Sequence, residues 1–389
     1  MKYTNHYRQI QVLTVVCVSW FSSCSQTRFR DTNYHYSIPA QLGDGIMIGN
    51  IANSNIDSFK IIELTKLILK DTFPNFHSLL IAKDNKLVYE NYFSGKDENW
   101  GSGLGYAKHD IDILHDTRSI SKSVVAACID IAIQQKKINS IDDPIFNYLK
   151  DYIQYKTKEN EAITIRQLLT MSSNIAWDED VPHGTSENDE TQMERSSNPI
   201  KYVLSRQMKT ESTPVWKYNS GGVQVLAEII TSASGDNVDK FAEKYLFKPL
   251  GITKYKWIKS HRKFLAAASG LRLCSRDLLK LGLLYLNKGK WNSKQVISEN
   301  WVTETLRKQI NRTKYSTTKG YSLLFWTDAD TVKKKPFELI IAKGNGGQRI
   351  FLNQQLNLIV VVTAGNYNKK GIVNDGQLAM NKYILPALR

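Results

Sequence analysis

The sequence predicts an α/β protein of the α+β kind, in which an antiparallel sheet is flanked by helices and carries an inserted all-helical region. Runs rich in β-branched and aromatic residues lie near residues 78–93 and again at 339–363, with helical patterns between them. The 389-residue chain is 42% hydrophobic and 23% charged, an ordinary globular composition. One sheet must therefore be assembled from segments that are far apart in the sequence.

The first 24 residues have the pattern of an export signal. Lys2 and Arg8 precede an apolar run over residues 10–21, which is too short to span a bilayer comfortably. Two serines and Cys24 follow, and this order resembles the lipobox of bacterial lipoproteins, in which the cysteine becomes the lipidated first residue of the mature chain. We expect an exported lipoprotein of the periplasm or outer membrane that contacts the membrane through Cys24. Plain secretion and an uncleaved anchor are the alternatives.

Residues 25–56 contain polar and glycine-rich stretches, which indicate a tether and a lead-in that packs on the main body. Residues 57–380 then form one domain. We expect its sheet region at about residues 57–118 and 265–389, and its helical region at about residues 119–264.

Strands are expected at both ends of this domain. Residues 78–82 and 87–93 are apolar and aromatic runs on either side of Lys83-Asp84-Asn85-Lys86, which predicts two strands joined by a tight turn. Beyond Lys319 the chain returns to β-rich runs separated by turn residues, at 339–342, 349–352 and 358–363.

Apolar periodicity predicts helices between these strands. The segment after Ser119 is apolar around most of its circumference, as expected for a helix that is packed on several sides. Asp143 and Pro144 are expected to begin one helix, and Thr164 to cap another that ends near Asn174. Further helices are expected within residues 220–250, at 271–286 with Ser275 as the cap, and at 376–388.

The four cysteines exclude a disulfide scaffold. Cys17 lies inside the apolar run and Cys24 in the lipobox-like segment, which leaves Cys128 and Cys274. A single bridge between these two is open to the sequence. Two buried thiols that behave as small hydrophobic residues are the preferred interpretation.

The formal net charge of +15 does not indicate a nucleic-acid-binding protein. Lysines are scattered, the tight cluster being Lys333-Lys334-Lys335, and no module with interleaved aromatic residues appears. Such an excess could favour anionic polymers or lipid headgroups, but a solvated basic surface explains most of it. We expect a small-molecule or peptide substrate and no nucleic-acid partner. The sequence leaves the oligomeric state open.

The motif that carries chemistry is Ser119-Ile120-Ser121-Lys122. One helical turn separates the Ser119 hydroxyl from an amine that can remove its proton, which is the basic requirement of a covalent serine hydrolase. A helix that begins at the nucleophile also directs its free N–H groups toward developing negative charge. Ser316-Thr317-Thr318-Lys319 has the same spacing, but no buried helix follows it, so we assign the motif to Ser119.

Three ordered blocks, at residues 117–123, 137–144 and 163–173, resemble those of the class C β-lactamase-related serine hydrolases. That superfamily includes penicillin-recognising enzymes, esterases and 6-aminohexanoate-oligomer hydrolases. The resemblance covers roughly residues 57–380. It implies the β-lactamase/transpeptidase-like fold, with Ser119 as the nucleophile and Lys122 as its proton-transfer partner.

The second element of that family is a tyrosine on a loop that faces the nucleophile, within Tyr-x-Asn in its β-lactamases. Tyr218-Asn219-Ser220 stands at the matching position. The resemblance implies that Tyr218 relays protons, a role worth ~10²–10⁴ in rate, and the alternative is a buried structural tyrosine. Ser220 in place of asparagine resembles the esterase and amide-hydrolase branches and weakens the case for efficient β-lactam turnover.

The third element is a Lys-Thr-Gly or His-x-Gly stretch on the strand that lines the other side of the cleft. Here the glycine-rich residues 342–349 stand in its place with neither order present. The resemblance implies that a backbone N–H of this stretch joins that of Ser119 in an oxyanion hole, with Asn345 or Gly346 as the expected donor. An ordinary hairpin turn is the alternative.

Two acidic islands, residues 177–180 and 187–190, follow the short helix capped by Thr164. In this family the region rims the cleft, where carboxylates could hold a cationic substrate amine. A solvated loop is the preferred interpretation.

The sequence indicates no cofactor and no metal site. Its seven histidines show no His-x-His or His-Glu-x-x-His spacing, and His115, although close to Ser119, is expected to be structural. A Gly-x-Ser-x-Gly elbow is also absent from the sequence. The predicted function is an exported serine hydrolase that cleaves an ester, amide or β-lactam bond through an acyl-enzyme on Ser119. Esterase or amidase and peptidase activity is favoured over efficient β-lactamase activity, and the alternative is a non-catalytic, penicillin-binding-like binding or regulatory protein.

Overall fold

The computed structural model describes residues 33–211, 213–260, 264–313, 316–332, 335–369 and 375–389. The predicted signal and Cys24 lie outside the described residues. None of the helices in the described part of the chain has the length and apolarity needed to cross a bilayer.

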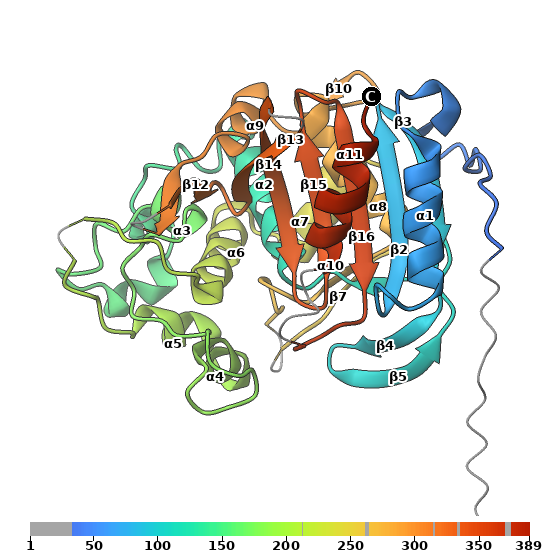
Figure 1. The fold of residues 1–389 in the computed structure, drawn as a ribbon. Coiled ribbons are helices and arrows are strands. Elements are labelled where there is room, and N and C mark those ends of the chain that lie inside the picture. Colours follow the sequence, from blue (N-terminus) through green and yellow to red (C-terminus); the bar gives the residue numbers. More distant parts are fainter. Residues whose placement is uncertain (1–32, 212, 261–263, 314–315, 333–334, 370–374) are drawn as a thin grey trace, which may run out of the picture. The chain divides into compact units, whose positions relative to one another are not determined.

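A nine-stranded sheet with the order β1-β3-β2-β16-β15-β14-β13-β12-β11 organises the chain (Figure 1). β2 (Phe76–Lys83) pairs antiparallel with β16 (Leu358–Ala364), which confirms that the sheet joins distant segments. The expectation of a wholly antiparallel sheet is wrong in one respect. The short strand β1 (Met47–Ile48) runs parallel to β3 (Lys86–Tyr92), because the lead-in to the domain is added along that edge.

The predicted hairpins are confirmed. Asp84 and Asn85 have φ values of 50° and 61°, the left-handed conformation that a two-residue turn between β2 and β3 requires. β14 (Lys335–Gly344) and β15 (Gln348–Asn353) continue the sheet next to β16. Its far edge, which the sequence analysis missed, consists of β11 (Ile310–Thr313), β12 (Ser316–Tyr321) and β13 (Trp326–Val332).

Helices cover both faces of the sheet (Figure 1). Along β14, Leu339 and Ile341 belong to one core, whereas Ile340 and Ala342 belong to the other, as alternation along a strand requires. The first core lies under α1 (Ser58–Leu69), α10 (Asp375–Ala379), the π-helical turn η7 (Met380–Ile384) and α11 (Leu385–Ala387). The second lies between the sheet, α8 (Ser275–Leu286) and the helical region.

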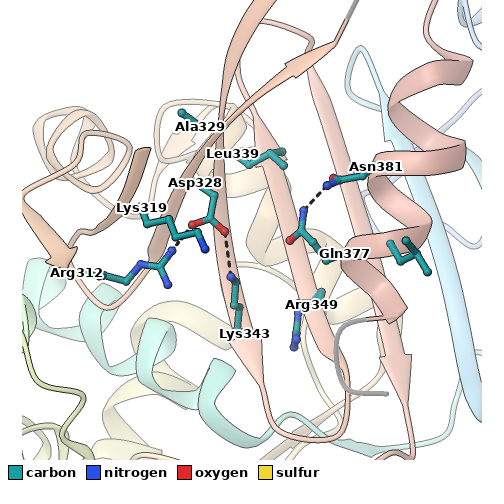
Figure 2. Close-up of a pocket in the computed structure, with 10 residues that line it drawn as sticks. Arg312, Lys319, Asp328, Ala329, Leu339, Lys343, Arg349, Gln377 and Asn381 are labelled. Atoms are coloured by element: carbon teal, nitrogen blue, oxygen red, sulfur yellow. Dashed lines mark hydrogen bonds and ion pairs between the residues drawn. The ribbon is translucent and has the colours of Figure 1, made fainter. Parts of the chain in front are cut away.

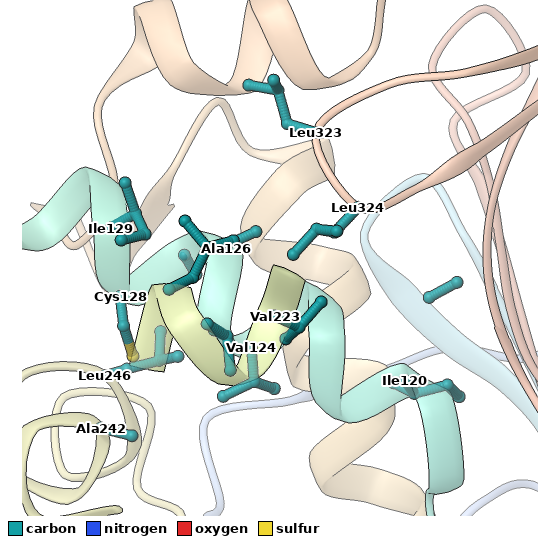
Figure 3. Close-up of a cluster of buried hydrophobic side chains, with 14 of the residues drawn as sticks. Ile120, Val124, Ala126, Cys128, Ile129, Val223, Ala242, Leu246, Leu323 and Leu324 are labelled. Carbon is teal, nitrogen blue, oxygen red and sulfur yellow. The ribbon is translucent and has the colours of Figure 1, made fainter. Parts of the chain in front are cut away.

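The helical region is built around α2 (Ser121–Gln134), whose residues 121–132 are all buried. Figure 3 shows Val124 of this helix close to Val223 and Leu246, which come from α6 (Ser220–Ser234) and the π-helical turn η5 (Glu243–Phe247). α2 is thus a buried central helix, as its apolar circumference predicts. The other helices of the region are α3 (Ile165–Leu169), α4 (Asp189–Arg195), α5 (Pro199–Leu204) and α7 (Val238–Ala242).

Several shorter elements connect these layers. They are η1 (Ile51–Asn53), β4 (Gly95–Asn99), β5 (Ser102–Ala107), β6 (His115–Asp116), η2 (Arg118–Ile120), η3 (Ile145–Asn147), η4 (Lys150–Tyr155), β7 (Lys256–Trp257), β8 (Leu271–Leu273), β9 (Lys290–Trp291), β10 (Lys294–Gln295) and α9 (Glu299–Thr305).

The predicted helix boundaries are partly right. Thr164 caps α3 in a full capping box with Gln167, and Asn174 is left-handed with φ 58°, although the helix ends earlier, at Leu169. Ser275 is the first residue of α8 rather than its cap, which is Cys274, and its hydroxyl lies 2.8 Å from that of Ser78 in β2. Asp143 caps no helix, since its carboxylate accepts the hydroxyl proton of Tyr148 at 2.5 Å.

The two cysteines in the described part of the chain, Cys128 and Cys274, are free and buried, in agreement with the preferred interpretation. Burial raises the pKa of the Cys128 thiol well above its ordinary value, so this side chain acts as a small hydrophobic residue.

Candidate active site

Ser119 lies in the single 3₁₀ turn η2, immediately before α2. The preceding residue, Arg118, has φ 50°, a left-handed conformation that costs free energy for a residue with a side chain. Its guanidinium pairs with Glu98 and lies 3.3 Å from Asp116, and these contacts hold the turn in place. The nucleophile candidate therefore sits on a strained and tightly held turn at the entry to the central helix.

Lys122 is one turn further along and only 1% exposed. Its ammonium nitrogen Nζ lies 3.0 Å from the Ser119 hydroxyl oxygen and 3.1 Å from the carbonyl oxygen of Ala268. These two contacts aim the amine at Ser119, as the spacing of the two residues predicts.

Tyr218 comes from the loop before α6, almost 100 residues later in the chain, and reaches the same point. Its hydroxyl interacts with Ser119, and the Lys122 nitrogen lies 5.0 Å from the centroid of its ring. Burial, with the nearby Glu179 carboxylate, raises the pKa of Tyr218 well above its ordinary value, while the interaction with Ser119 acts in the opposite direction. The phenol is thus protonated at neutral pH and can donate a proton.

Glu179 is the site residue that sequence analysis missed. Its carboxylate accepts hydrogen bonds from the backbone N–H of Ser220 at 2.9 Å, from the Ser220 hydroxyl at 3.0 Å and from the indole N–H of Trp177 at 2.6 Å. Burial raises the pKa of Glu179 to about 7, with Glu190 acting in the same direction and Lys122 against it. The expectation that this loop is solvated is therefore wrong for Glu179.

Other carboxylates of the two acidic islands are also of two kinds, exposed and buried. Asp178 and Asp180 are exposed and pair with Lys217, at 3.6 and 2.5 Å, as a solvated loop requires. Asp189, by contrast, is buried and accepts a hydrogen bond from the Tyr202 hydroxyl at 2.6 Å.

Ser220 is completely buried at the first position of α6, with Asn219 as the N-cap. Its hydroxyl is bound to Glu179, so it connects the Tyr218 loop to the loop that follows α3. The next residue, Gly221, has no room for a side chain, because a Cβ there would lie 2.6 Å from the Trp177 ring. Tyr218 is thus anchored through its neighbours in sequence.

Asn345 and Gly346 lie in the turn between β14 and β15. The Asn345 amide donates to Asn368 at 2.6 Å, and the carbonyl of Gly346 accepts from the N–H of Asn366 at 3.0 Å. These bonds tie the turn to the loop after β16. Gly344 of this stretch lies against the nucleophile segment, since a Cβ there would be 2.2 Å from the Thr117 carbonyl oxygen. An oxyanion-hole role for Asn345 or Gly346 stays a prediction.

A basic pocket of about 480 Å³ is lined by Arg312, Lys319, Asp328, Lys343 and Arg349, together with residues of α10 and η7 (Figure 2). The Lys343 nitrogen and the Arg312 guanidinium lie 5.0 and 4.7 Å from the centroid of Trp326, whose ring is 5.5 Å from that of Tyr218. Burial lowers the pKa of Lys343 to about 8, although Asp328, 3.2 Å away, opposes the shift.

Comparison with known proteins assigns this arrangement to a family. The family described as Beta-lactamase matches residues 77–379, which include Ser119, Lys122 and Tyr218. The chain belongs to the Beta-lactamase family. Its similarity to class C β-lactamase-related proteins and its β-lactamase/transpeptidase-like fold are thereby confirmed.

Similar proteins carry several different names. A Bacillus subtilis protein named "Putative penicillin-binding protein PbpX" is 27% identical over 180 residues, which cover 44% of this chain and 41% of that protein. The match thus spans less than half the length of that relative. Among solved structures, a "Putative 6-aminohexanoate-dimer hydrolase from Bacillus anthracis" has a TM-score of 0.65 and 18% identity, covering 80% of this chain and 81% of its own.

A second solved structure, the penicillin binding protein from Bacillus halodurans, has a TM-score of 0.63 and 15% identity. The similarity covers 82% of this chain and 99% of that one. At these identities the two structures support the fold alone, so the chemistry must be argued from this chain's own side chains.

Proposed function

We propose that this protein is an exported serine hydrolase that cleaves ester or amide bonds through an acyl-enzyme on Ser119. The observation that supports it best is the meeting of three side chains from two segments: the Ser119 hydroxyl, the Lys122 amine 3.0 Å away, and the Tyr218 phenol, which interacts with Ser119. Nucleophile, base and acid are the groups that acyl transfer requires.

In this mechanism the Ser119 oxygen attacks the carbonyl carbon of the substrate, while its proton passes to the Lys122 amine. Tyr218 then donates its phenolic proton to the leaving alcohol or amine as the bond to that group breaks, and the Lys122 ammonium stabilises the phenolate and returns the proton. Water attacks the acyl-enzyme in the second half, and Ser119 recovers its proton. The protonated state of Tyr218 suits it to the role of acid.

The charges of the basic pocket favour a substrate with an anionic group. Lys343 and Arg312 lie against Trp326, and that ring packs on Tyr218, so a carboxylate held in the basic pocket would be one aromatic ring away from the proposed acid. Peptides with a terminal D-residue, and other amides or esters that carry a free carboxylate, meet this requirement. Because the Ser220 hydroxyl is already bound to Glu179, we rank efficient β-lactam turnover below the hydrolysis of esters and other amides.

A panel of purified substrates tests this function. Full-length protein is assayed with p-nitrophenyl esters, D-amino-acid amides with and without a terminal carboxylate, and a chromogenic cephalosporin. We expect turnover of an ester or amide that Ser119→Ala loses and Ser316→Ala keeps. Absence of any hydrolysis by folded protein that still binds these compounds would favour the alternative, a penicillin-binding-like binding protein. The observation that supports this alternative is that residues 342–349 contain neither the Lys-Thr-Gly nor the His-x-Gly order.

The exported location rests on the N-terminal sequence. We expect Cys24 to become the lipidated first residue and to anchor the protein to the membrane, in the periplasm or at the outer membrane. Membrane fractionation and the intact mass of the mature chain test this, with Cys24→Ser as the variant. Release of that variant from the membrane fraction is the expected result, and an unchanged distribution would contradict it.

A further inference from the structure

A compact group of metal-ligating side chains lies outside the hydrolytic site. His77 of β2, Asp97 of β4, His109 after β5 and His115 of β6 are all buried, and one ligand atom from each lies within 4.8 Å of all the others. His115 is four residues before Ser119. The cluster therefore joins the β4–β5 hairpin to the central sheet and to the segment that carries the nucleophile.

The carboxylate separations are close to those of a tetrahedral site, whereas the His77 and His109 rings are stacked with centroids 3.8 Å apart and have to rotate for both to reach one ion. Oxygen Oδ1 of Asp97 is 3.9 Å from Nδ1 of His77 and 3.7 Å from Nε2 of His115, and Oδ2 is 3.9 Å from Nε2 of His109. In a tetrahedral site with metal–ligand bonds of about 2.0–2.1 Å, neighbouring ligand atoms are about 3.4 Å apart. The carboxylate contacts need to close by about 0.5 Å or less to reach that spacing.

The surroundings orient these ligands as metal sites do. Nδ1 of His115 bonds to the carbonyl oxygen of Asp116 at 3.1 Å, which leaves Nε2 facing the cluster. The Tyr367 hydroxyl donates to Asp97 at 3.2 Å. Nε2 of His109 is buried without a hydrogen-bond partner, an expensive state for a polar atom that a ligand would relieve.

Two of the imidazoles are in direct contact. Nδ1 of His77 and Nε2 of His115 are 2.8 Å apart and share one hydrogen bond. An ion between them would replace that bond and move the two nitrogens apart by about 0.6 Å.

We propose that His77, Asp97, His109 and His115 form a structural zinc site. Three imidazoles and one carboxylate are ligands that zinc accepts in tetrahedral geometry, whereas magnesium and calcium prefer oxygen ligands alone. Four protein ligands complete the coordination and leave no open position, so the ion supports the fold rather than reacting with substrate. It fixes the hairpin of β4 and β5 against the turn that presents Ser119.

Metal analysis of the full-length protein, purified untagged and without chelator, tests the proposal. We expect one zinc ion per chain by elemental analysis, and an X-ray absorption spectrum with only nitrogen and oxygen neighbours at about 2.0–2.1 Å. His109→Ala should lose the zinc, whereas His35→Ala, a change at an exposed histidine, should keep it. Zinc content below one ion in ten chains, or equal content in His109→Ala and wild type, would overturn it.

Two further measurements keep the test decisive if His109→Ala does not fold. Chelator-treated wild-type protein is titrated with Zn²⁺ against a competing dye, and with Co²⁺ while its visible spectrum is recorded. Stoichiometric uptake with tetrahedral cobalt bands and a rise in thermal midpoint supports the site, and no uptake overturns it. Tyr367→Phe should weaken zinc affinity by about 10-fold or more, because it removes the bond that orients Asp97. None of these readouts depends on hydrolytic activity.

Discussion

Glu179 holds Ser220 through both its backbone N–H and its hydroxyl, at 2.9 and 3.0 Å. This pair connects the loop after α3 with the first turn of α6 and so fixes the position from which Tyr218 reaches Ser119. It also explains why a small hydroxyl residue fits at the third position of the motif that begins with Tyr218: the carboxylate accepts a hydrogen bond there, and the space is fully buried.

The raised pKa of Glu179 gives stability a pH dependence. Burial raises it from an ordinary 4.5 to about 7, so the folded chain binds this proton more tightly than the unfolded chain. The resulting stabilisation is complete below about pH 4.5 and is lost as the pH rises through about 7. We expect the free energy of unfolding to fall less steeply over this range in Glu179→Gln. Denaturant titrations between pH 4.5 and 7 measure the free energy of unfolding, with Asp180→Asn, a change at an exposed carboxylate, as the control. An equal dependence of this free energy on pH in wild type and Glu179→Gln would contradict the prediction.

Two adjacent glycines at the start of α6 should respond in opposite ways to alanine. In Gly221→Ala the new Cβ meets the Trp177 ring at 2.6 Å and Val203 at 2.8 Å, so we expect a loss of about 1–3 kcal/mol in the free energy of unfolding. In Gly222→Ala the nearest atom is on Leu168 at 3.4 Å, an ordinary contact, and the better helix propensity should add about 0.5–1 kcal/mol. Thermal or denaturant unfolding compares them, and equal effects would refute the packing argument.

Tyr218→Phe removes only the phenolic oxygen. Because the proposed acid is lost while the ring stays packed on Trp326, we expect kcat to fall by ~10²–10⁴ with little change in stability. Tyr255→Phe is the matched control, since its hydroxyl bonds to Glu243 instead, at 2.7 Å. Steady-state kinetics on the best substrate decides the point, and a near-normal kcat in Tyr218→Phe would remove this residue from the mechanism.

Lys343 should act on substrate binding rather than on chemistry. Its pKa is lowered to about 8, so its positive charge is present below that pH and is lost above it. For a substrate with a carboxylate we expect KM to rise above about pH 8 in the wild type. Lys343→Met should raise this KM below about pH 8 and change it little above, while KM for a neutral ester is unaffected. If the variant changes KM for both substrates equally, the basic pocket does not recognise the anionic group.

The predictable part of the fold is the part with strong local patterns. The hairpin of β2 and β3, the buried α2 helix and the strands from β14 to β16 are long apolar runs bounded by turn residues, and the sequence predicts them directly. β4, β5 and the strands β11 to β13 are polar or glycine-containing, so they become strands only because their neighbours pair with them.

The same distinction applies to the site. Ser119, Lys122 and Tyr218 stand in recognisable motifs, but Glu179 is one of several acidic residues in a row, and only the packed structure shows that it alone turns toward Ser220. His77, Asp97, His109 and His115 have no regular spacing. They come together because the β4–β5 hairpin folds back on the start of β2, which no local pattern reveals.

The central claim is that Ser119 is the nucleophile, and covalent labelling tests it most directly. Purified full-length protein is treated with a fluorophosphonate, and the modified residue is located by mass spectrometry of its peptides. The account predicts a single adduct on Ser119 that is lost in Ser119→Ala and kept in Ser316→Ala, whose serine has the same spacing to a lysine. Folded wild-type protein that stays unlabelled, or carries its adduct on another residue, would contradict it.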